Sequence, residues 1–174
     1  MFEEFIPESQ RLARLGQKID PTTILSLEGN APRGRLIYFS DNARCRHCHH
    51  VDDPGQSLGP TLREINRKYP RRVEFLQQIL QPSLKIEEKF RARVVVTTEG
   101  RLHTGLLERE SPREIVLRTT EKKKLTLARD DIDELQTSPR SLMPEFLLSD
   151  LTAQQAADLL VYLQSLGAAP PSKP

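Results

Sequence analysis

The sequence predicts a mainly α-helical fold that is interrupted by a small antiparallel β module, so that the chain is α+β overall. Two observations lead to this prediction. Apolar residues recur at helical spacing before residue 90 and after residue 138, whereas residues 91–137 alternate between apolar and polar side chains. The helices therefore bracket the strands along the chain.

Prolines and apolar spacing mark the helices before residue 90. Pro21 and Pro32 suit the first turns of two helices, and Pro82 ends another. Helices are expected over residues 8–18 (a weak pattern), 21–27, 32–40, 61–68 and 70–80. The first 30 residues are interpreted as a lead-in or linker from an upstream domain.

The middle of the chain has the period of β-strands. Glu99–Gly100 and the charged residues 121–123 are expected to form tight turns. Strands are expected over residues 91–97, 102–107, 114–120, 124–128 and 132–136. Consecutive short strands of this kind predict a small antiparallel sheet or barrel.

A final helix is predicted after residue 151. Thr152 and Gln155 have the spacing of a capping box, apolar residues from Ala156 to Leu166 fall on one stripe, and Gly167 suits a C-terminal stop. The proline-rich residues 169–174 are expected to be a disordered tail.

Composition limits the classes of protein to which the chain can belong. Its 174 residues suffice for one domain, or for one small domain with an inserted module. A net charge of +2 does not call for nucleic acid as a partner, and no apolar run is long enough for an integral membrane segment. Hydrophobic residues make up only 37% and Trp is absent, so a large apolar cofactor would help to complete the core.

Cys45, Cys48 and His49 form the sequence Cys-x-x-Cys-His, which contains both cysteines of the chain. This sequence is typical of the covalent attachment of haem c. Each thiol adds to one haem vinyl group as a thioether, and two intervening residues on a helical turn direct both sulfurs to one edge of the porphyrin. The adjoining His49 can then supply an imidazole nitrogen as an axial ligand of the iron.

Three other interpretations of the cysteine pair remain open at this point. A thioredoxin-like redox pair would need a βαβ context, which this stretch lacks, and a short disulfide or two inert thiols would need no cofactor. A structural zinc site would need four ligands. Two of them would have to come from His47, His49, His50 and His103.

A wider set of residues resembles class I cytochrome c. The set comprises a short helix with Gly34, the attachment motif, Gly59–Pro60, and a final helix with Tyr162. The resemblance implies a cytochrome c helical fold in which Gly34 and Tyr162 lie where the first and last helices cross. It also implies that the Pro60 carbonyl orients His49.

The predicted β insertion makes the chain similar to a narrower group. This is the haem-binding domain at the C-terminal end of large secreted dehydrogenase-like proteins of the planctomycete and verrucomicrobial type. The similarity covers residues 31–167. It implies a cytochrome c core over 31–90 and 138–168, and an inserted sheet or barrel over 91–137. Its most telling stretches are residues 81–83, 94–97, 105–107, 129–132 and 141–145.

Met143 is the expected sixth ligand of the iron. It lies far downstream of the attachment motif, between Leu142 and Pro144, as the distal methionine does in this class. The alternative is a core methionine that fills a gap. Of the histidines, His50 adjoins the proximal ligand and cannot reach the opposite face of the haem, and His103 is expected to be exposed.

Together these predictions describe a non-enzymatic electron-transfer domain with no catalytic residues and one haem c. A fused dehydrogenase domain or a redox partner protein would supply the electron. The alternatives are a haem enzyme or sensor with an open sixth site, and a zinc-stabilised interaction module. Haem attachment requires export, for example to the periplasm, yet residues 1–5 contain no signal-peptide features. Either the chain is a piece of a longer exported protein, which is the favoured expectation, or its signal has been removed.

Overall fold

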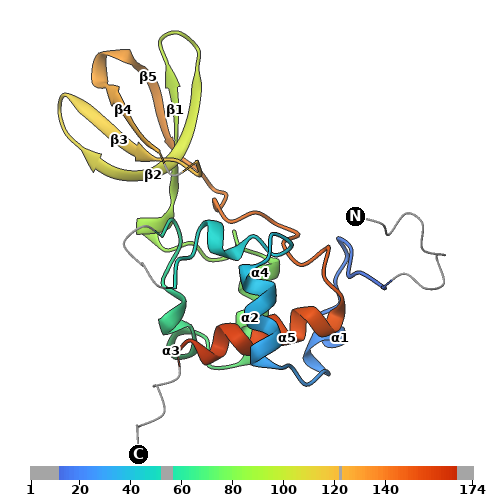
Figure 1. The fold of residues 1–174 in the computed structure, drawn as a ribbon. Helices are drawn as coiled ribbons and strands as arrows, with labels where there is room; N and C mark the ends of the chain where they lie inside the picture. Colours follow the sequence, from blue (N-terminus) through green and yellow to red (C-terminus); the bar gives the residue numbers. More distant parts are fainter. Residues whose placement is uncertain (1–11, 52–56, 122, 168–174) are drawn as a thin grey trace, which may run out of the picture. The chain divides into compact units, whose positions relative to one another are not determined.

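The predicted fold class, a mainly α cytochrome c fold, is wrong. A computed structural model describes residues 12–51, 57–121 and 123–167, and this part of the chain is α+β, with five α-helices and one five-stranded antiparallel sheet (Figure 1). The longest helix has only 13 residues. The sheet contains a buried apolar cluster of its own. The sheet therefore has an apolar core of its own and is more than a small addition to a helical fold.

The helices and strands lie close to their predicted positions. The helices are α1 (Pro21–Leu25), α2 (Ala31–Phe39), α3 (Ile65–Lys68), α4 (Arg72–Leu80) and α5 (Ala153–Ser165). The strands are β1 (Ala92–Thr97), β2 (Leu102–Glu110), β3 (Glu114–Arg118), β4 (Lys124–Ala128) and β5 (Ile132–Thr137). Short 3-10 turns occupy Cys45–His47, Leu62–Glu64, Glu88–Phe90 and Arg129–Asp131. The expected tail over 169–174 lies outside the described residues.

The chain divides into two compact units whose segments alternate along the sequence. The first contains residues 1–45, 62–76 and 146–174, and the second contains residues 46–61 and 77–145. None of the helices in the described ranges has the length and apolar character needed to cross a membrane.

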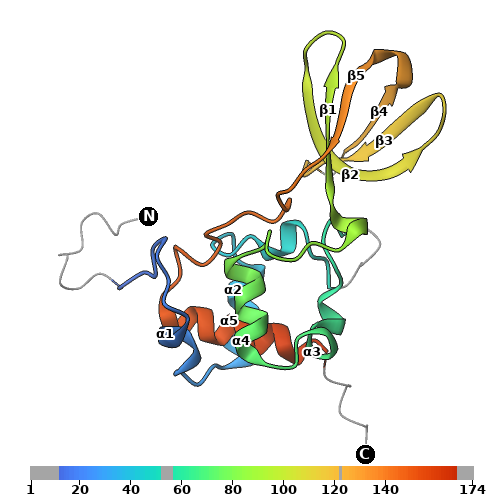
Figure 2. The same cartoon turned by 180° about the vertical axis from the view of Figure 1, so that it is seen from behind.

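In the first unit, α2 crosses α5 at a glycine, as Figure 1 shows from the front and Figure 2 from behind. A Cβ atom on Gly34 would lie 2.0 Å from the Asp158 carbonyl oxygen and 2.7 Å from Cβ of Tyr162. Only a residue without a side chain allows this approach. One turn further along α2, the ring of Tyr38 is buried with its centroid 5.5 Å from that of Tyr162. Gly34 and Tyr162 thus lie at the helix crossing.

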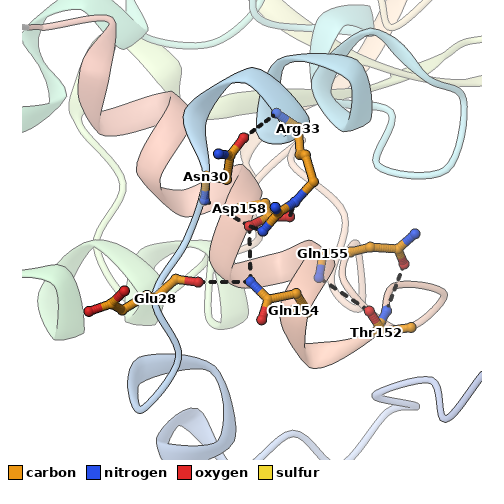
Figure 3. A network of polar contacts seen from close by, with 7 residues as sticks. All are labelled: Glu28, Asn30, Arg33, Thr152, Gln154, Gln155 and Asp158. Atoms are coloured by element: carbon orange, nitrogen blue, oxygen red, sulfur yellow. Dashed lines mark hydrogen bonds and ion pairs between the residues drawn. The ribbon is translucent and has the colours of Figure 1, made fainter.

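A buried carboxylate joins the start of α2 to α5 (Figure 3). The Asp158 side chain is 3% exposed and accepts hydrogen bonds from the Asn30 amide (2.7 Å), from Arg33 Nε (2.6 Å) and from Gln154 Nε2 (3.0 Å). Burial raises the pKa of Asp158, but these hydrogen bonds together outweigh it, and the pKa lies below its ordinary value. Asp158 is therefore held as a carboxylate.

Local capping supports the same two helices. The Asn30 side chain accepts a hydrogen bond from the Arg33 amide (3.0 Å) and caps α2. At α5, Thr152 and Gln155 form the predicted capping box, with bonds of 3.2 Å and 2.9 Å between each side chain and the other residue's amide (Figure 3).

The lead-in packs as part of the first unit. Ile24 on α1 is fully buried, and the Leu15 and Gly16 amides donate to the carbonyls of Leu151 and Ser149, each at 2.9 Å. The predicted helix over 8–18 is wrong over residues 12–18, which are not helical. Their amides bond to a distant segment, which an extended backbone allows and a helix does not. Residues 8–11 lie outside the described residues.

In the second unit the strands form a sheet in the order β4-β3-β2-β1-β5. Strands β1 to β4 follow one another as a meander, and β5 returns to pair with β1. Val95, Ile115 and Leu117 are completely buried on one face, where five partly buried side chains join them: Leu107, Leu125, Leu127, Ile132 and Leu135. Gly100, with φ +77°, makes the predicted turn between β1 and β2.

Candidate haem attachment site

The attachment motif begins on a 3-10 turn that follows a left-handed residue. Arg44 has a φ of +53°, which turns the chain immediately before the Cys45–His47 turn. Cys45 and Cys48 are both half-buried, and no disulfide joins them. The Cys45 thiol contacts the Ala43 carbonyl at 3.4 Å. Reduced thiols near the surface are the form that can add to a haem vinyl group.

His49 is oriented by a backbone carbonyl. Its Nδ1 atom lies 2.8 Å from the Pro60 oxygen. Because a carbonyl oxygen can only accept a hydrogen bond, Nδ1 carries the proton and Nε2 carries the lone pair of the neutral ring. Burial lowers the pKa of His49, the Pro60 bond raises it and the neighbouring His50 lowers it, with a net lowering. The ring is thus a neutral imidazole whose Nε2 is the nitrogen suited to bind a metal.

Gly59 forms the surface against which the His49 ring lies. A Cβ atom at this position would be 2.3 Å from Cε1 of the ring and 2.8 Å from both ring nitrogens. These distances leave no room for any side chain. Sequence reasoning used Gly59 only as part of the Gly-Pro pair and missed its contact with His49. The glycine-proline pair was the available signal.

Backbone hydrogen bonds hold Gly59 and Pro60 beside the motif. The amides of Leu58 and Gly59 both donate to the Cys48 carbonyl, at 2.9 Å and 3.1 Å. The His50 amide donates to Ser57 Oγ at 2.8 Å. Residues 57–60 therefore return to the segment that contains His49. This is how a proline eleven residues downstream contacts the ring.

Met143 lies in an irregular segment between β5 and α5 and is half-buried. Its amide donates to Ser141 Oγ at 3.1 Å, and the Ser141 amide donates to Ser83 Oγ at 3.1 Å. Met143 belongs to the same compact unit as Cys48, His49 and Pro60, whereas Cys45, Gly34 and Tyr162 belong to the other.

The other histidines do not form a metal site with the cysteines. His103 was expected to be exposed, but it is half-buried on β2 opposite Val95. Alternation along β2 directs it toward the apolar face of the sheet, which explains the difference. Within residues 12–51, 57–121 and 123–167, no three His, Cys, Asp or Glu side chains gather closely enough to hold a metal ion. The zinc alternative has no support among these residues.

Comparison with known proteins does not assign a family: no family model matches the sequence, and no curated protein matches it. The residues present nevertheless suit a covalently bound haem. Two half-buried thiols stand three residues apart, and a neutral imidazole with Nδ1 already bonded follows the second. Met143 would be the thioether ligand.

Proposed function

We propose that this chain covalently binds one haem c and transfers single electrons, without converting a substrate. The observation that carries the proposal is the 2.8 Å contact between His49 Nδ1 and the Pro60 carbonyl, directly after a Cys-x-x-Cys pair. A histidine that binds a metal is usually held by a hydrogen bond from its other ring nitrogen. The resemblance of the motif to c-type cytochromes supports the same function.

Each side chain has a defined part in this proposal. The thiols of Cys45 and Cys48 would hold the haem: each S–H would add across one vinyl group, with the sulfur bonded to one vinyl carbon and the hydrogen to the other. No oxidant is needed. His49 Nε2 and Met143 Sδ would bind the iron. A bound haem would supply one-electron redox chemistry at that iron.

Two protein side chains bound to the iron would keep it from reacting with a substrate. If His49 and Met143 both bound the iron, they would leave no coordination position open to a substrate. A thioether ligand also favours the reduced iron and raises the reduction potential relative to two imidazoles. The electron would come from a redox partner protein or a fused dehydrogenase domain in an exported compartment such as the periplasm.

Mass spectrometry of the denatured protein tests covalent attachment. The chain is expressed with an added export signal in a host that matures haem c, and is then denatured in acid. We expect a mass increase of one haem that survives denaturation. The Cys45→Ala/Cys48→Ala double variant should lose the increase, and His103→Ala should keep it. An unmodified chain from the competent host would exclude the proposed function.

A further inference from the structure

The loop that contains Met143 is fixed at two places within the second unit. The Ser138 amide donates to the carbonyl of Ala92 in β1 at 2.8 Å. The Ser141 amide donates to Ser83 Oγ at 3.1 Å, across 58 positions of sequence. Between residue 138 and the start of α5, the backbone forms neither strand nor α-helix. These contacts therefore replace the order that secondary structure would otherwise provide.

The second of these contacts continues to Met143 itself. Ser141 Oγ accepts the Met143 amide proton at 3.1 Å, which is the two-residue turn that serine side chains commonly make with the backbone. Ser141 thus holds the backbone of Met143, and Ser83 holds the backbone of Ser141. The relay consists of Ser83 Oγ, the Ser141 amide and hydroxyl, and the Met143 amide.

Ser83 is well placed to be the fixed end of this relay. It lies three residues after the end of α4, in a segment held by two backbone hydrogen bonds. The Gln81 amide donates to the Gln77 carbonyl at 2.8 Å, and the Leu84 amide donates to the Gln81 carbonyl at 3.0 Å. Pro82, immediately before Ser83, is buried and restricts the backbone. The hydroxyl of Ser83 thus projects from an ordered turn.

We infer that Ser83 and Ser141 are positioning residues that hold the Met143 loop in the arrangement that places its thioether on the iron. This inference rests on the proposed haem function. A methionine side chain is flexible and its sulfur is an uncharged ligand, so the fraction of time it spends on iron depends on how well its backbone is held. Loss of either serine hydroxyl lowers that fraction.

Competition by imidazole measures this fraction directly. Exogenous imidazole binds the ferric iron only when Met143 has left, so its apparent affinity rises as the bound loop becomes less favoured. Ser141→Ala and Ser83→Ala each remove one relay hydrogen bond. From the net strength of a single hydrogen bond, we expect imidazole to bind about 2- to 10-fold more tightly to each variant. The reduction potential should fall as well.

Matched variants separate the relay from general loop disorder. Ser141→Thr keeps the hydroxyl and should bind imidazole with the same affinity as the parent chain. Ser138→Ala removes a different hydrogen bond of the same loop, the one that Ser138 Oγ accepts from the Arg140 amide. It leaves the relay intact and should have little effect on the imidazole affinity. A double variant completes the test: with Met143→Ala already present, Ser141→Ala should change nothing further.

The outcomes distinguish failure of the relay from failure of the proposed ligand. If Met143→Ala leaves both the ferric spectrum and the imidazole affinity unchanged, Met143 is not the ligand and the proposed ligation fails. If Met143→Ala raises the affinity but neither serine variant does, the relay is overturned and the ligation stands. An equal effect of Ser138→Ala would also overturn the relay. Far-ultraviolet circular dichroism checks folding, and if one serine-to-alanine variant misfolds, the other one, which removes a different bond of the relay, decides the test.

Discussion

Gly59 and Pro60 act on the same side chain from two directions. The Pro60 carbonyl binds Nδ1 of His49, and Gly59 leaves the space that the ring occupies. One residue therefore sets the rotation of the imidazole, while the other permits its position. Neither residue carries a reactive group, yet together they decide whether Nε2 can be presented to a metal.

Gly59→Ala should displace the His49 ring. The new Cβ would lie 2.3 Å from Cε1, so either the ring or the backbone must move. We expect a loss of about 1–3 kcal/mol in the free energy of unfolding, as for other overpacked sites. The ferric absorption spectrum of the haem-loaded protein should also change. Urea unfolding and the spectrum are the two measurements.

Gly100→Ala is the matched control. It also replaces a glycine, and its φ of +77° strains any side chain, but nothing lies within 4 Å of the new Cβ. It should cost about 1 kcal/mol of stability and leave the spectrum unchanged. A normal spectrum in Gly59→Ala would contradict the role assigned to this glycine.

At the scale of elements, the crossing of α2 and α5 depends both on contacts between near neighbours in the sequence and on contacts between distant residues. The capping box at Thr152 is local, and its spacing predicted it. Two of the residues that donate to Asp158, Asn30 and Arg33, lie more than 120 positions away and left no local pattern. The sequence places an aspartate within the final helix, but its partners could not be chosen without the fold.

Stability should depend on pH through Asp158. Because its pKa is lowered in the folded chain, the carboxylate contributes stability above its ordinary pKa of 3.8, and this contribution is lost as pH falls through the lower folded value. The free energy of unfolding should therefore fall more steeply below about pH 4 in the parent chain than in Asp158→Asn. Urea unfolding from pH 6 to pH 2.5 measures both slopes.

The same experiment gives the strength of the Asp158 network. At neutral pH, Asp158→Asn should be less stable by about 1.5–3 kcal/mol, the range for hydrogen bonds to a charged group. Glu28→Gln serves as a control, since only the backbone carbonyl of Glu28 joins the network. Parallel pH profiles for the parent and Asp158→Asn would exclude the proposed linkage.

At the scale of the whole molecule, the sheet is a second structural centre. Its cluster around Val95, Ile115 and Leu117 is complete within one unit. The segments 46–61 and 77–90, which the sequence assigned to the helical core, cluster with the sheet instead. Sequence periodicity finds elements, but the grouping of elements follows from contacts between distant residues.

Leu117→Ala should destabilise the sheet selectively. Leu117 is completely buried, and removal of its side chain should cost about 2–5 kcal/mol through lost burial and the cavity left behind. Amide hydrogen exchange should quicken in β1 to β5 more than in α2 and α5. Leu102→Ala, at a position 67% exposed on β2, is the control and should have little effect. Equal loss of protection in α2 and α5 would show that the units open together.

The sequence alone determined the features that depend on short spacing. Periodicity, prolines and glycines located the helices and strands of the described residues within a few residues, although the predicted helix over 8–18 is wrong over 12–18. Five adjacent positions contain the candidate attachment motif. These signals act between near neighbours. Only the tertiary structure decided that the sheet has a buried cluster of its own and does not merely interrupt a mainly α cytochrome c fold. It also decided that Gly59 borders His49, that Asp158 joins α2 to α5, and that Ser83 holds Ser141. Each of these depends on residues that meet only after folding, since long-range contacts leave no periodic trace in the chain.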